Sequence, residues 1–197
     1  MHPLIFLFRF VRFFFVWRGN HRFSAQSHPV LNNGIMPVVE ICHLYISSGH
    51  NFFGHHGQKA DNYPAIEVPS IECVSGHGIR GDRFFDYRND YQGQITFFSL
   101  EVFDDLCRAL ELKDCSPGSV RRNVFVRGID LNSLIGKEFE VQGVQFRGTG
   151  ECKPCYWMNQ ALAPGAEEFL EGRGGLRARI LSDGMLRSMP ALAGVNR

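Results

Sequence analysis

The stretch EFEVQGVQFRGTGECKPCYW, residues 138–157, holds both the clearest strand pattern in the chain and its most reactive motif. Apolar and polar residues alternate on both sides of Gln142-Gly143, which predicts two antiparallel strands joined by a two-residue turn. This hairpin leads directly into Cys152-Lys153-Pro154-Cys155, which places two thiols on one tight turn. The lysine between them favours the thiolate, the form that attacks electrophiles and binds soft metals. The two cysteines are therefore the first candidates for chemistry.

Short strands dominate the rest of the pattern. Segments rich in β-branched and aromatic residues predict strands over residues 38–47, 66–74, 94–98, 123–127 and 176–181. Apolar residues at helical spacing after Ser99, a suitable N-cap, predict one clear helix, and residues 164–170 predict a short one. Because strands and helices show no βαβ alternation, we expect a mainly β fold, as a closed or nearly closed β-barrel.

Length and composition exclude several classes of protein. A chain of 197 residues can bury a full apolar core as one domain, and its net charge of +1 argues against nucleic acid as a partner. Six cysteines in a chain of this size, without a convincing secretory signal, predict free thiols in a reducing compartment. We therefore expect a cytoplasmic protein.

The first 35 residues form a distinct segment. Residues 1–17 are dense in Phe, Leu and Val, but Arg9 and Arg12 interrupt the run, which falls short of the roughly 20 residues that span a bilayer. Met36 opens a segment that reads as a natural chain start followed by a strand. We expect residues 1–35 to be an extension outside the fold, from a misplaced start or as a membrane-surface anchor, and residues 36–197 to be the domain. A membrane partner is not expected.

The cysteine pair allows four interpretations. A structural zinc site needs further ligands at close spacing, and a thioredoxin-like pair needs a helix start after a βαβ-type strand. Two inert, buried thiols are the third interpretation. The fourth is a single thiolate ligand to the metal of a cofactor.

Two arginine-bearing segments favour the fourth interpretation. Arg121-Arg122-Asn123 directly precedes a predicted strand, and taken alone it is a solvated charge run. The glycine-rich segment 76–83 adds further arginines, and guanidinium groups suit phosphate. Its Gly-x-Gly-x-x-Gly spacing is no dinucleotide fingerprint, because no amphipathic helix follows. Two such turns near one thiol turn describe a pocket for a phosphorylated, metal-bearing small molecule.

A family resemblance rests on motifs that occur in a fixed order. The motifs are Gly81-Asp82-Arg83-Phe84, Gln94-Ile95-Thr96, Arg121-Arg122-Asn123-Val124, Gly128-Ile129-Asp130-Leu131-Asn132, Leu134-Ile135-Gly136-Lys137 and Cys152-x-x-Cys155. Over residues 38–186 the chain resembles the MOSC domain, the module at the C-terminus of molybdenum cofactor sulfurases. The resemblance implies a β-barrel of the pyruvate-kinase-inserted-domain type and a bound molybdenum cofactor (molybdopterin). One departure is that Arg187-Ser188-Met189-Pro190 stands where the family commonly has a Gly-Asp turn and a final strand.

The resemblance also implies roles for individual residues. Cys155 would ligate molybdenum and be the catalytic group, and Arg121 and Asn123 would hold the pterin phosphate region. The remaining cofactor contacts that it implies are Arg83, Ser99, Cys152 and Lys153, with Ser48 as a weaker candidate.

Three functions follow from these roles. The first is an oxidoreductase that reduces N-oxygenated or N-hydroxylated small molecules with electrons from a separate donor protein. The second is a sulfur carrier, in which Cys155 forms a persulfide for cofactor or metal-cluster assembly. The third is a catalytically silent barrel with a structural Cys-x-x-Cys motif.

Overall fold

The computed structural model describes residues 39–51 and 59–189, so the predicted extension over residues 1–35 lies outside the described residues. The strands are β1 (Glu40–Ile46), β2 (Ile66–Glu67), β3 (Ser70–Val74), β4 (Gly78–Ile79), β5 (Ile95–Ser99), β6 (Val124–Arg127), β7 (Glu138–Val141), β8 (Val144–Glu151), β9 (Leu176–Ile180) and β10 (Gly184–Arg187). The helices are α1 (Leu100–Ala109), α2 (Trp157–Ala161) and α3 (Ala166–Phe169), with the 3-10 turns η1 (Pro117–Val120) and η2 (Leu131–Leu134). None of the helices in this described part is long and apolar enough to cross a membrane.

Backbone pairing joins the strands into two sheets. The larger is a mixed sheet in the order β2-β1-β6-β5-β9-β8-β7, and the smaller has the order β10-β3-β4. The mainly β class is therefore confirmed, with few helices. Among the described strands the pairing closes no ring, so the closed barrel is not found and its pyruvate-kinase-like form stays a prediction.

One connection corrects the expectation that strands and helices do not alternate. Strands β5 and β6 pair in parallel, with Phe97 opposite Val124, and α1 is the crossover between them. Parallel neighbours require a crossover of this kind, because a tight turn can join only antiparallel strands. This βαβ unit places the start of β6 beside β5, and the candidate site is built at that start.

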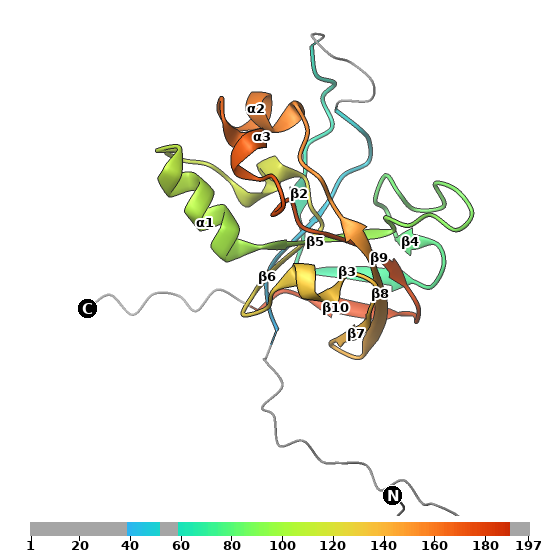
Figure 1. The fold of residues 1–197 in the computed structure, drawn as a ribbon. Coiled ribbons are helices and arrows are strands. Elements are labelled where there is room, and N and C mark those ends of the chain that lie inside the picture. Colours follow the sequence, from blue (N-terminus) through green and yellow to red (C-terminus); the bar gives the residue numbers. More distant parts are fainter. Residues whose placement is uncertain (1–38, 52–58, 190–197) are drawn as a thin grey trace, which may run out of the picture. The chain divides into compact units, whose positions relative to one another are not determined.

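Alternation along the central strands divides the core into two layers. Phe97 and Val124 belong to a cluster between the two sheets, whereas their neighbours Phe98 and Phe125 face the opposite side. On that side α1, α2 and α3 pack against the larger sheet (Figure 1). Each fully buried aromatic side chain contributes roughly 2–3 kcal/mol through its removal from water, so both layers stabilise the central strands.

The local patterns produce the elements that they predict. Gln142 and Gly143 both have positive φ, 51° and 81°, which is the conformation of a tight hairpin turn, and β7 and β8 pair on either side of it. Ser99 caps α1 by accepting a hydrogen bond from the Val102 amide. The short helix expected over residues 164–170 appears as α3, while α2 was not predicted. No helix follows the glycine-rich segment 76–83.

Candidate functional site

A buried polar network gathers where β1 ends and β6 begins. At its centre lies Asp82, whose side chain is 1% exposed. One of its carboxylate oxygens accepts hydrogen bonds from the Ser47 amide at 3.1 Å and the Asn123 side chain at 3.2 Å. The same oxygen lies 3.4 Å from the Arg83 guanidinium, and the other accepts from the Phe84 amide. Asp82 therefore ties the glycine-rich turn to two strands.

Arg121 enters this network from the end of η1. It has the left-handed φ of 54° that ends the 3-10 turn, and its guanidinium donates to the carbonyls of Tyr63 at 2.6 Å and Gly49 at 2.7 Å. It also donates to the Ser47 hydroxyl at 3.0 Å. All three acceptors are neutral. Burial, assisted by the positive charge of Arg83, lowers the pKa of Arg121 to about 10.

Arg83 lies beside Arg121 and is more deeply buried. Its side chain is 10% exposed, and it donates to the Arg121 carbonyl at 3.2 Å. Burial lowers its pKa, and the charge of Arg122 lowers it further, against the opposite effect of Asp82. The same charges act on His50. Burial lowers the pKa of its imidazole most, and the positive charges of Arg83 and Arg121 lower it further. The structure thus brings together two predicted arginines and places His50 beside them, a loop histidine that the sequence favours as a surface or pocket-lining residue.

Arg122 is the third guanidinium of the cluster and is also buried. It donates to three carbonyls, those of Val120 at 2.9 Å, Cys152 at 3.0 Å and Gly174 at 3.1 Å. These carbonyls belong to three different segments of the chain. Arg122 therefore connects the arginine segment to the thiol turn.

The network carries more positive than negative charge. Three guanidiniums, those of Arg83, Arg121 and Arg122, are fully or partly buried in it. Within the described residues, Asp82 is the only carboxylate that bonds to any of them. Buried charges are normally paired, because transferring an unpaired ion out of water is costly. The surplus of positive charge fits an anionic group such as phosphate.

Asn123 lies inside the network rather than at a surface. It is 2% exposed, and its amide oxygen accepts hydrogen bonds from the Thr96 amide and hydroxyl at 3.1 and 2.8 Å. Its amide nitrogen donates to the Tyr45 carbonyl and to Asp82, both at 3.2 Å. The side chain uses both donors and both acceptor sites within the protein, so it orders β1, β5 and β6 around the arginines.

The two thiols of the turn differ in exposure. Cys152 is 8% exposed, its amide donates to the Gly175 carbonyl at 2.7 Å, and its carbonyl accepts from Arg122. Cys155 is exposed, and its carbonyl accepts from the Met158 amide at the first turn of α2. All six cysteines of the chain are free thiols. Cys155 is thus the thiol of the turn that a ligand can reach.

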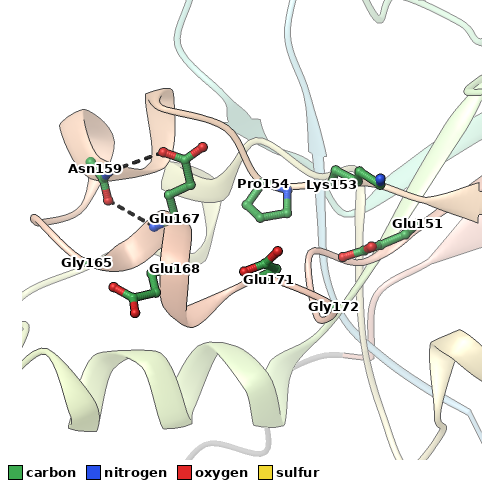
Figure 2. Close-up of a pocket in the computed structure, with 9 residues that line it drawn as sticks. All are labelled: Glu151, Lys153, Pro154, Asn159, Gly165, Glu167, Glu168, Glu171 and Gly172. Carbon is green, nitrogen blue, oxygen red and sulfur yellow. Dashed lines mark hydrogen bonds between the residues drawn. The ribbon is translucent and has the colours of Figure 1, made fainter.

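Two cavities lie near the candidate site, one lined by Arg121 and the other by residues of the thiol turn. Arg121 and Trp157, the first residue of α2, line a cavity of about 340 Å³. A larger cavity, of about 670 Å³, is shown in Figure 2, with Lys153 and Pro154 of the turn at one end and α3 at the other. Its acidic lining residues are Glu151, Glu167, Glu168 and Glu171. Lys153 therefore borders an acidic cavity.

Two of the predicted contacts, Ser99 and Ser48, are not among the side chains of the network described above. Ser99 is at the carboxyl end of β5, roughly 10 Å along the strand from Thr96, and its hydroxyl is engaged with α1 and Glu101. Ser48 is exposed, whereas its neighbour Ser47 is 1% exposed and makes the contacts to Arg121 and Asp82. The strand pattern ended at Ser47 but gave no sign of this network.

Close packing of Gly174 on the thiol turn gives a testable prediction. A Cβ atom on Gly174 would lie 2.3 Å from the Cys152 carbonyl oxygen and 2.9 Å from Pro154, so Gly174→Ala must displace the turn. We expect urea denaturation to show a loss of about 2–3 kcal/mol. Gly150→Ala is the matched control, because nothing lies within 4 Å of its added Cβ. Equal losses in the two variants would contradict the packing.

Comparison with known proteins shows first which solved structures have a similar fold and then the family to which the chain belongs. The fold is similar to that of the YuaD protein from Bacillus subtilis, with a TM-score of 0.59, 18% identity, and coverage of 78% of this chain and 93% of that one. It is also similar to YiiM from Geobacillus stearothermophilus (TM-score 0.55, 11% identity, 76% and 71% covered) and from Escherichia coli (0.52, 14%, 77% and 65%). The model of the MOSC domain family matches residues 55–188. The chain belongs to the MOSC domain family, and comparison with curated proteins gives no match.

Proposed function

We propose that this MOSC domain protein binds the molybdenum cofactor and reduces N-oxygenated or N-hydroxylated small molecules. The observation that carries the proposal is the surplus of buried positive charge beside a turn with an exposed thiol. The guanidiniums fit the phosphate of the cofactor, and a thiolate is a soft, strongly donating ligand for its metal. The barrel of the pyruvate-kinase-inserted-domain type belongs to the same proposal.

The position of each residue indicates which part of the cofactor it would bind. Arg121 would hold the phosphate, because the hydrogen-bond acceptors of its guanidinium are neutral and leave its charge uncompensated. Arg83, which bonds to the Arg121 carbonyl, would add a second positive charge. Cys155 would supply the sulfur ligand. When bound, the cofactor supplies two-electron oxygen-atom chemistry, which matches removal of a nitrogen-bound oxygen as water. The electrons would come from a separate donor protein.

The other predicted contacts take supporting roles in this proposal. Asn123 keeps the arginine segment in place through Asp82 and Thr96. Cys152 anchors the turn through its backbone, while Lys153 faces the acidic cavity next to it. Ser99 caps α1, so its part would be to fix the βαβ unit.

A sulfur carrier is the second candidate. The observation in its favour is the exposure of Cys155, since a persulfide must reach both its donor and its acceptor. This function needs the thiol but leaves the buried guanidiniums without a ligand. Mass spectrometry of the purified chain tests it, because a persulfide adds one sulfur atom to the peptide that contains Cys155.

Elemental analysis for molybdenum and fluorescence detection of pterin test the leading proposal. The protein is purified from a host that makes the cofactor, and we expect both near one per chain in the wild type. Arg121→Gln should lower the pterin content at least about tenfold, since a charged hydrogen bond to phosphate contributes roughly 1.5–3 kcal/mol. Arg108→Gln is the control, because Arg108 is exposed on α1. Absence of molybdenum and pterin from the wild type would overturn the proposal.

A further inference from the structure

Arg122 differs from its neighbours in what it contacts. Arg121 and Arg83 bond to the loop after β1, to each other and to Asp82. Arg122 bonds to main-chain carbonyls alone, and each lies in a segment with its own place in the site. The Val120 carbonyl belongs to the last residue of η1, directly before Arg121. The Cys152 carbonyl belongs to the thiol turn, and the Gly174 carbonyl belongs to the loop on which that turn packs.

We infer that Arg122 is a positioning residue that fixes the Cys152–Cys155 turn relative to Arg121, so that thiol and guanidinium act on one ligand. The inference rests on the proposed function for the identity of that ligand. The guanidinium is planar, with donors diverging from one rigid fork, so it sets the relative places of three carbonyls at once. Burial makes the bonds strong and excludes water as a substitute.

The position of Arg122 in the sequence supports this role. Residues 121 and 122 are adjacent, and Arg121 has a left-handed φ of 54°, so the two side chains leave the backbone in different directions. One reaches the loop after β1 and the other reaches the thiol turn. The loop after β1 and the thiol turn are therefore joined through one peptide unit and its two flanking side chains.

Lysine is the informative replacement, because it keeps the charge and loses the fork. An ammonium at the end of a flexible chain cannot span three carbonyls from separate segments. Arg127→Lys is the matched control, since Arg127 is the last residue of β6, the strand that Arg122 precedes, but pairs with Asp104 of α1 at 2.6 Å. Both variants retain the net charge of the chain.

Amide hydrogen exchange measures the positioning directly. In Arg122→Lys we expect exchange over residues 151–158 to accelerate about 10- to 100-fold, the range for losing charge-assisted buried hydrogen bonds. Exchange over residues 138–147 of the β7–β8 hairpin should stay as in the wild type, and Arg127→Lys should change neither region. A residue that only stabilised the fold would accelerate both regions together. Unchanged exchange over residues 151–158, or equal acceleration everywhere, overturns the inference.

Alkylation of Cys155 measures the consequence for the site. Iodoacetamide reacts with an accessible thiol, and a ligand held by both Arg121 and the thiol turn restricts its access to Cys155. Inorganic pyrophosphate at about twice its Kd should slow modification of wild-type Cys155 about threefold, because only the unoccupied fraction of the protein then reacts. Site-resolved mass spectrometry follows the rate. In Arg122→Lys, pyrophosphate should still raise the melting temperature but no longer slow alkylation.

The two measurements separate the inference from the proposed function. If pyrophosphate protects Cys155 equally in wild type and Arg122→Lys, the inference is wrong. If pyrophosphate neither stabilises wild type nor slows its alkylation, the anion site of the proposed function fails. Hydrogen exchange then still decides whether Arg122 holds the turn.

Discussion

Asp82→Ala lowers the free energy of unfolding by about 3–5 kcal/mol, the largest stability effect that we expect from a single site. Asp82 is the carboxylate at the centre of the network, and its side chain is 1% exposed. Its removal leaves the buried guanidiniums without a compensating negative charge. It also leaves the Ser47 amide and the Asn123 side-chain amide without the carboxylate oxygen that accepts their hydrogen bonds. Urea denaturation followed by circular dichroism measures the loss, and Asp82→Asn, which preserves the shape, serves if the alanine variant does not fold.

Asp86→Asn is the matched control for this prediction, because Asp86 has a left-handed φ of 52° that asparagine tolerates better than alanine. Asp86 is in the same loop, its side chain is 59% exposed, and it pairs with His77 at 2.5 Å. Exposed ion pairs contribute about 0–1 kcal/mol, so the control should unfold close to the wild type. Pyrophosphate should raise the melting temperature of Asp82→Asn more than that of the wild type, because the variant has more uncompensated charge to neutralise. A loss below about 1 kcal/mol for Asp82→Ala would contradict the network.

The predictable parts of the fold are those determined by neighbours in the chain. The hairpin follows from alternation around Gln142-Gly143, and α1 follows from its periodicity and the Ser99 cap. Three features depend on partners far along the chain and could not be derived from local sequence. The parallel pairing of β5 and β6 is not encoded in either strand, and β10 is assigned only through its pairing with β3. Strand pattern alone could not decide between an open sheet and a closed barrel.

In the site, too, the local motifs could be predicted, and the contacts between distant segments could not. Spacing and resemblance indicated Arg121, Arg83 and the cysteine turn, because motifs are local. The burial of Asp82 and Ser47 arises only when the end of β1 meets the glycine-rich turn. Arg122 looked like half of a solvated pair, and its direction depends on the left-handed backbone at Arg121. Adjacent arginines ahead of a buried strand were the available signal.

The second large effect concerns the thiols. Cys155→Ser should remove molybdenum from the purified protein, by more than the roughly 10- to 100-fold that loss of an outer-shell partner costs. Oxygen of a serine is a hard donor that substitutes poorly for a soft thiolate. Because Cys155 is exposed, the melting temperature should stay within a few degrees of wild type, as is usual for a surface substitution. Elemental analysis and thermal denaturation check the two halves of the prediction.

Cys152→Ser is the control that shows which of the two thiols is the molybdenum ligand. Both variants remove one sulfur from the same turn, but Cys152 is buried, and the contacts that anchor it are made by its amide and carbonyl, which serine retains. It should therefore keep its molybdenum while losing some stability, because a hydroxyl replaces a buried thiol. The reverse result, with metal lost from Cys152→Ser and kept by Cys155→Ser, would assign the ligand to the buried thiol. Arg122 bonds to the carbonyl of Cys152 and not to its sulfur, so the structure makes Cys152 an anchor of the turn, and the proposed function assigns the metal ligand to Cys155.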